Sequence, residues 1–183
     1  MRTPRLPLVA ASLAAAVLAL PAAAQAKLPS FAHASFTANV GVGGAKLGQG
    51  VAAGLRAWGG SRRGACDDLG CIFDDPLHPE LGSAVLGYEA GRRGKITKVV
   101  LTAGFNRSGR PAFKAPLASL RGAGGIHLGS SESAVRKAYP KAKPVPGQAG
   151  FIGLRGRHGY QTFFGFQSGR LIQIVVEDGR RRG

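Results

Sequence analysis

The stretch GGIHLGSSESAVRKAY, residues 124–139, decides the fold, because a similar stretch occurs 81 residues upstream. This upstream copy, residues 43–58, reads GGAKLGQGVAAGLRAW. Each copy has two glycines, an apolar residue, a lysine or histidine, Leu-Gly, and a short helical pattern that ends in an aromatic residue. Self-similarity at a fixed period indicates that one structural unit occurs twice along the chain.

Each copy predicts a short helix with a start and a stop. In the second copy Ser130 or Ser131 can cap the first turn, Glu132 adds favourable negative charge there, and Pro140 ends the run. Helices this short fall below the roughly 12–15 residues that an isolated helix needs, so a sheet must hold them. The residues expected to face that sheet are Leu47, Val51, Leu55 and Trp58 in the first copy and Leu128, Val135 and Tyr139 in the second.

Two predicted hairpins also repeat, with strands at 84–89 and 96–101 and again at 160–167 and 171–176. Strand side chains alternate between faces, so one face is expected to carry Thr97, Val99, Leu101, Ile172, Ile174 and Val176. The opposite face then carries Lys98 and Gln173 in equivalent places. This pattern predicts an antiparallel sheet that is covered on one face and polar or basic on the other.

The predicted fold class is therefore α+β: a tandem duplication of a short helical segment followed by an antiparallel β-meander, with one sheet face packed on the helices. The first repeat spans residues 27–104 and the second spans residues 122–178. A linker over 105–121 joins them, and a basic tail over 179–183 follows.

The first 26 residues predict a secretory signal peptide. A basic start, residues 1–5, precedes an apolar, alanine-rich run over 6–20 and the small-x-small site at Ala24-Gln25-Ala26. The apolar run is shorter than the roughly 20 residues that a membrane span needs. We therefore expect a secreted, extracytoplasmic protein that does not span a membrane and begins near Lys27.

The chain is strongly basic, with 25 lysines and arginines against 9 acids and a formal net charge of +16. Such a positive field attracts anionic surfaces, which outside the cytoplasm means wall polymers, lipid headgroups or acidic proteins. The charge can also serve solubility alone. Nucleic acid is not an expected partner, because an exported protein seldom meets it.

Cys66 and Cys71 are the only cysteines and lie in a chain predicted to be exported, which indicates a disulfide between them. A metal or redox pair is the alternative, but a metal site needs further ligands that the sequence does not supply. An acidic stretch follows, and its aspartates make a weak calcium candidate: Asp67, Asp68, Asp74 and Asp75. Their spacing matches no known calcium loop, so a solvated acidic loop is the favoured reading. No cofactor is expected.

The order of Leu-Gly, short helix, aromatic and strand meander, occurring twice, resembles the beta-lactamase inhibitory protein-like fold. The run Ile126-His127-Leu128-Gly129-Ser130-Ser131 is similar to the Ile-x-Leu-Gly-x-Ser opening of outer-membrane assembly lipoproteins of the SmpA/OmlA type. The resemblance implies helices on an antiparallel sheet and a role in protein binding. The chain differs from the inhibitor in its basic charge and single cysteine pair, and from the lipoproteins in lacking a lipid-anchor cysteine.

The sequence favours binding over catalysis. It contains no Gly-x-Ser-x-Gly or Ser-x-x-Lys motif, and its histidines are scattered: His33, His78, His127 and His158. The leading hypothesis is a secreted, non-catalytic protein that binds another exported or envelope protein through an exposed sheet face. The residues proposed for that surface are Lys98, Gln161, Gln167, Gln173, Arg92 and Arg93. Two alternatives remain: an envelope protein that binds anionic wall polymer or lipid by charge, and a hydrolase with an unrecognised site.

Overall fold

The computed structural model describes residues 28–31, 33–59, 65–89 and 94–181. The predicted signal peptide, the Arg92-Arg93 turn and the last two residues of the tail lie outside this part of the chain. Within it, no helix is long and apolar enough to cross a membrane.

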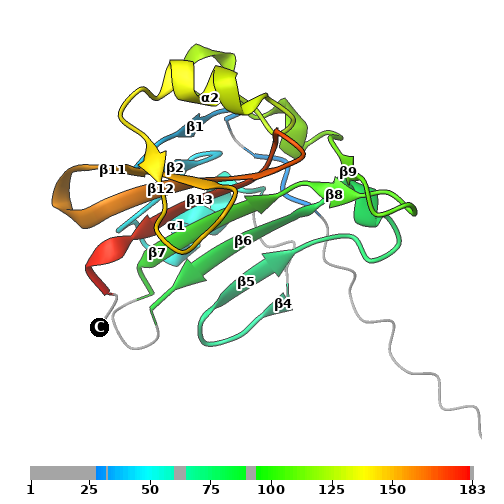
Figure 1. Cartoon of the computed structure of the whole chain (residues 1–183). Helices are drawn as coiled ribbons and strands as arrows, with labels where there is room; N and C mark the ends of the chain where they lie inside the picture. Colours follow the sequence, from blue (N-terminus) through cyan, green and yellow to red (C-terminus); the bar gives the residue numbers. More distant parts are fainter. Residues whose placement is uncertain (1–27, 32, 60–64, 90–93, 182–183) are drawn as a thin grey trace, which may run out of the picture.

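A single antiparallel sheet of eight strands organises the molecule, in the order β10-β11-β12-β13-β7-β6-β5-β4 (Figure 1). One half of the sheet contains β4 (Ala65–Cys66), β5 (Gly70–Phe73), β6 (Ser83–Tyr88) and β7 (Ile96–Thr102). The other half contains β10 (Lys143–Pro144), β11 (Phe151–Arg155), β12 (Tyr160–Gln167) and β13 (Arg170–Asp178). The two halves meet where β7 pairs with β13, so each is a meander of neighbouring strands.

Each half is preceded by a helix of seven residues, α1 (Val51–Ala57) and α2 (Glu132–Ala138). A small three-stranded sheet precedes α1 and consists of β1 (Phe36–Thr37), β2 (Gly41–Val42) and β3 (Ala45–Lys46). A hairpin of β8 (Gly104–Phe105) and β9 (Pro111–Ala112) lies between the halves. The described residues are therefore α+β, as expected from the sequence.

The segment that connects the halves belongs to the core. Residues 105–121, expected to be a linker, include strand β9 and a short 3-10 turn at Leu117–Ser119. Leu117 and Leu120 are only 1% and 2% exposed. Because two leucines are removed from water here, this segment contributes to stability as well as connecting the halves.

One face of the sheet, called the core face here, packs under both helices. Its buried residues include Leu86, Val99 and Leu101 from the first half and Phe164, Ile174 and Val176 from the second. On α1, Gly54 is buried so closely against β7 that an added Cβ would lie 2.4 Å from Ile96 Cδ1. Glycine weakens a helix, but here it lets the helix approach the sheet.

Both helices begin with the same set of backbone hydrogen bonds to the sheet. Gly48 N–H donates to Ile96 O at 2.8 Å, and Gly129 N–H donates to Leu171 O at the same distance. In return, Ile96 N–H donates to Gln49 O and Leu171 N–H donates to Ser130 O. These bonds hold the turn that follows each Leu-Gly motif, just before the helix, against a buried strand residue. That residue is Ile96 in β7 and Leu171 in β13. Gly48 and Gly129 have φ of 76° and 95°, which favours glycine at that turn.

The expected face assignment is correct for Val99, Leu101, Ile174 and Val176 and wrong for Thr97, while Ile172 is only partly buried at the margin of the core. The fully buried residues at the starts of these strands are Ile96 and Leu171, at 1% and 0% exposure. The pairing register shifts between Gly87 and Tyr88 in the first hairpin and between Gly165 and Phe166 in the second. Such a bulge breaks the strict alternation of side chains, so the strand turns a different residue inward at its start.

The predicted disulfide is present. Cys66 of β4 and Cys71 of β5 are register partners in a short hairpin, and their sulfur atoms are 2.08 Å apart. Cys71 is buried at 1% exposure, so the bond ties the edge strand β4 to the core. Closure of so short a loop is expected to stabilise the fold by about 2 kcal/mol.

Candidate functional site

The face of the sheet that points away from the helices, called the open face here, has an apolar row along its middle. Register pairing places five apolar side chains side by side across five strands: Ile72, Val85, Val100, Val175 and Phe163. Ile72 is 47% exposed, whereas Val175 and Phe163 at the other end are 9% and 8% exposed. The expectation of a polar or basic second face is therefore wrong along this row.

Polar residues flank the apolar row on both sides. One flanking row runs from Lys98 through Glu177 and Gln161 to Arg155, again as register partners. The other contains Ser83, Thr102 and Gln173. An apolar centre with polar margins is the usual layout of a protein-binding surface.

Four of the residues proposed from the sequence can be placed, and they do not form one cluster. Lys98 Nζ lies 3.3 Å from Glu177 Oε2, with Gln161 next along the same row. Gln173 lies in the opposite row, where its Nε2 donates to Thr102 Oγ1 at 3.3 Å. Gln167 is exposed opposite Arg170 at the end of the β12–β13 hairpin, away from these rows.

Two features of this face were not predicted from the sequence. One is Glu177, which offsets the charge of Lys98 and makes that margin less positive than expected. The other is the apolar row itself. Its signal was visible, since residues 99–101 and 174–176 are uninterrupted apolar runs, and a run without alternation predicts a strand that is apolar on both faces.

A cleft of about 560 Å³, called the Arg155 cleft here, lies at the β10 end of the open face. It lies where β10 ends: Lys143 and Pro144 pair with Gly153 and Ile152, and on that side no strand of the described chain pairs with Leu154 and Arg155. The Phe163 ring forms its floor beside Gly153, where an added Cβ would lie 3.2 Å from two ring atoms. Val145 and Pro146, which follow β10, form a wall.

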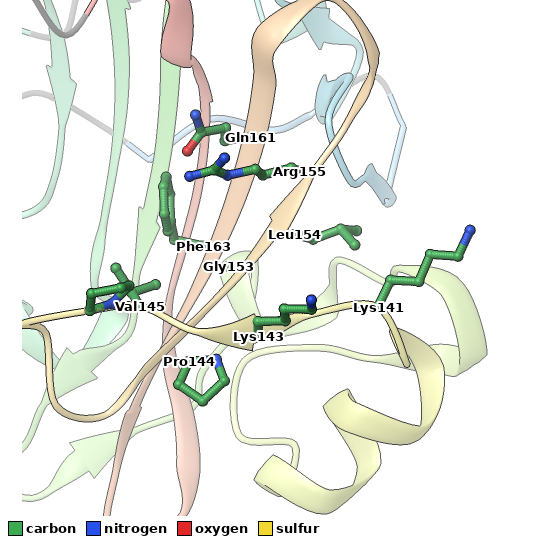
Figure 2. A pocket seen from close by; sticks show the side chains of 10 residues that line it. Lys141, Lys143, Pro144, Val145, Gly153, Leu154, Arg155, Gln161 and Phe163 are labelled. Atoms are coloured by element: carbon green, nitrogen blue, oxygen red, sulfur yellow. The ribbon is translucent and has the colours of Figure 1, made fainter.

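Three cations line the Arg155 cleft, namely Lys141, Lys143 and Arg155. Figure 2 shows the Arg155 guanidinium beside Gln161, with Lys143 on the neighbouring strand. No aspartate or glutamate of the described chain lines the cleft or forms a salt bridge with these three residues. The first carboxylate along the row is Glu177, which already pairs with Lys98.

The acidic stretch does not form the calcium site considered from the sequence. Asp67 Oδ1 accepts from the N–H groups of Leu69 and Gly70, and Asp75 Oδ1 accepts from Leu77 N–H. The hydrogen bond from His78 lowers the pKa of Asp75. Among the described residues, no three acids, histidines or cysteines gather where they could hold a metal ion. These carboxylates cap local turns instead, a common role for aspartate.

The four histidines are also separate. His78 Nδ1 lies 3.0 Å from Asp75 Oδ2, and His127 Nδ1 lies 2.6 Å from Leu128 O. His158 has a φ of 57° in the turn before β12, and His33 is exposed near the start of the described chain. None of them lies among the residues that line the Arg155 cleft.

Comparison with known proteins gives little beyond this description. No family model and no curated protein matches the chain. A crystal structure of a DUF4309 family protein, YjgB from Bacillus subtilis, is similar over 74% of this chain and 82% of its own, with 12% identity and a TM-score of 0.40.

Proposed function

We propose that this chain is an exported protein that binds another protein through the open face of its sheet. The observation that carries the proposal is the apolar row from Ile72 to Phe163, which lies on the face opposite the helices and is bordered by polar rows. Ile72 exposes 47% of its surface at the open end of the row. Covering such a side chain with a partner would remove apolar surface from water at about 25 cal/mol per Å².

We further propose that the two halves arose by duplication of one unit. The matching backbone hydrogen bonds at Gly48 and Gly129 support this view, as do the matching register shifts at Gly87 and Gly165. An eight-stranded face assembled from two four-stranded halves is broader than either half could offer. A broad face with a cleft only at its β10 end favours contact with a macromolecule, since small ligands prefer enclosed apolar pockets.

The binding proposal can be tested with the chain from Lys27 onward, immobilised and exposed to an envelope extract of the source cells. Ile72→Glu places a charge in the apolar row and is expected to reduce partner capture at both low and high salt. Lys98→Glu is expected to weaken capture chiefly at low salt, because charges at the margin act mostly on the encounter rate.

Matched controls lie on other surfaces. Val40, which is 40% exposed in the β1–β2 turn, is the control for Ile72, and Lys137 on α2 is the control for Lys98. Val40→Glu and Lys137→Glu are expected to leave capture unchanged. Equal losses in the face variants and the controls would count against the proposed surface. Salt-sensitive recovery of an anionic polymer in place of a protein would favour the alternative based on net charge.

A further inference from the structure

The Arg155 cleft combines a cationic rim with an apolar lining. Three cations, Lys141, Lys143 and Arg155, lie around it, and none forms a salt bridge within the described chain. Its floor and wall are apolar, provided by Phe163, Val145 and Pro146. Like charges around one cleft repel each other, and an anion bound between them would relieve that repulsion.

The apolar lining restricts the kind of anion. A bare inorganic anion would use the cations but leave the Phe163 floor and the Val145 wall in contact with water. The volume of about 560 Å³ holds more than one small oxyanion. A group that carries an apolar side chain beside its negative charge would use both parts of the cleft, since small-ligand sites are mostly apolar with a few polar groups that fix orientation.

The position of the cleft indicates how such a group would arrive. Phe163 in its floor is the last member of the apolar row, and Arg155 is the last member of the row that contains Lys98. A peptide segment lying across the open face could place apolar side chains along the row and carboxylates beside Arg155. The planar guanidinium of arginine can donate two parallel hydrogen bonds to one carboxylate.

We propose that the Arg155 cleft binds a carboxylate of a partner peptide next to an apolar side chain of the same peptide. This inference rests on the proposed function, because it names the chemistry of the partner segment that the open face receives. In it, Arg155 and Lys143 contact the carboxylate, and Phe163 and Val145 contact the apolar side chain. The carboxylate can come from an aspartate, a glutamate or the C-terminus of the partner.

The test measures binding of the peptide Asp-Leu-Asp-Phe-Asp, amidated at its C-terminus and labelled at its N-terminus with an uncharged fluorophore, to the chain from Lys27 onward. We expect saturable binding that is at least about tenfold tighter than that of the matched peptide with asparagine in place of aspartate. The double variant Arg155→Gln with Lys143→Gln is expected to lose at least about tenfold in affinity. Equal binding of the two peptides, or an unchanged double variant, would overturn the proposal.

The matched control removes the same charge elsewhere. Arg107 and Arg110 are exposed in the turn between β8 and β9, and the double variant Arg107→Gln with Arg110→Gln is expected to change affinity less than about twofold, as expected for screening between distant surface charges. If this control variant loses as much affinity for the peptide as the cleft variant does, the peptide is attracted by the net charge of the protein only. Circular dichroism checks that both double variants keep the fold.

Competition separates carboxylate from phosphate ligands. Inorganic phosphate and vesicles of phosphatidylglycerol are expected to displace the peptide poorly at physiological salt. Displacement by vesicles that also depends on Arg155 and Lys143 would overturn the assignment in favour of a lipid headgroup, and efficient displacement by inorganic phosphate would overturn it in favour of a free oxyanion.

Ile72→Glu separates this inference from the proposed function, because Ile72 lies at the far end of the apolar row. If the peptide binds through the cleft but Ile72→Glu leaves the amount of captured partner unchanged, the cleft assignment is supported and the open-face proposal is wrong. If Ile72→Glu reduces capture but the cleft variants leave the peptide affinity unchanged, the open-face proposal is supported and the cleft assignment is wrong.

Discussion

The two halves of the sheet share a framework and differ at their outer edges. In both halves a glycine turn hydrogen-bonds the helix start to the first buried residue of a strand, Ile96 or Leu171. At the outer edge of the first half, a disulfide joins β4 to β5. At the outer edge of the second half, β10 is as short as β4 but has no disulfide to β11, and the Arg155 cleft lies beside β11.

The helices show the same contrast between shared position and different chemistry. Ser131 caps α2 by accepting from Ala134 N–H, whereas Gly50 at the same place before α1 has no side chain to do so. Each helix is followed by a buried aromatic residue, Trp58 or Tyr139. Positions that hold helix to sheet are therefore equivalent in the two halves, while edges and caps are free to differ. Features specific to this protein should be sought at the edges.

The largest expected effect concerns the line where the halves meet. Ile174 of β13 pairs with Leu101 of β7 on the core face and is 1% exposed. Ile174→Asp would bury a carboxylate without a partner, and we expect it to abolish the cooperative urea transition, a loss above about 4 kcal/mol. Both halves should unfold together, because the buried residues form one continuous cluster.

Val100→Asp is the matched variant on the open face, where Val100 is only partly buried. We expect it to fold, with a smaller loss of stability. If Ile174→Asp folds normally while Lys98→Glu unfolds the protein, the assignment of the two faces is reversed. If Ile174→Asp leaves a separate transition for the first half, the halves are independent units.

The second effect removes the feature that only the first edge possesses. Replacing both Cys66 and Cys71 with alanine releases β4 from β5, and we expect the free energy of unfolding to fall by about 2 kcal/mol or more. Urea denaturation followed by tryptophan fluorescence measures this change, since Trp58 packs against Phe73 of β5 with ring centroids 5.4 Å apart. An unchanged midpoint would mean that the disulfide does not stabilise the first edge.

Much of the framework could be predicted from the sequence, because it depends on local signals. The Leu-Gly turns, the cap at Ser131 and the proximity of the two cysteines each act over a few residues. Thr97 was misplaced because a bulge is decided by pairing between strands, and that pairing is invisible in a single strand. The pair of Lys98 with Glu177 joins residues far apart in the chain, so only the meeting of β7 and β13 reveals it.

The candidate site was the least predictable part. The Arg155 cleft depends on where β10 ends, and a strand of two residues carries no periodic signal. Lys143, Arg155 and Phe163 become neighbours only through the register of three strands. The polar residues expected at the site, Gln161 and Gln173, do lie on the open face, but in different rows.

The third effect tests the difference in helix caps. Ser131→Ala should cost about 1 kcal/mol, because Ala134 N–H loses its acceptor. Gly50→Ser should gain a few tenths of a kcal/mol, since its φ of −63° suits serine and nothing lies within 4 Å of an added Cβ. Thermal unfolding of both variants measures the shifts. A loss of stability in Gly50→Ser would show that the start of α1 is held in another way.

The smallest effect is a loss of stability in alkali, and it concerns the aromatic residues that follow the helices. Trp58 Nε1–H donates to Val42 O and does not ionise, whereas Tyr139 Oη accepts from Ala123 N–H and can lose its proton. Burial raises the pKa of Tyr139 above the ordinary value of 10.0. The unfolded chain therefore releases this proton at a lower pH than the folded chain, so stability is unaffected below about pH 10 and falls as the pH rises further.

Tyr139→Phe should remove this part of the alkaline loss. At neutral pH it should cost about 1 kcal/mol, because Ala123 N–H loses its acceptor. The measurement is the difference in unfolding free energy between the natural protein and Tyr139→Phe at pH 8 and above pH 10, which cancels the titration of other groups. If that difference does not change with pH, the hydroxyl of Tyr139 reaches water in the folded state. Position 139 would then add no alkaline sensitivity to the second half, just as Trp58 adds none to the first.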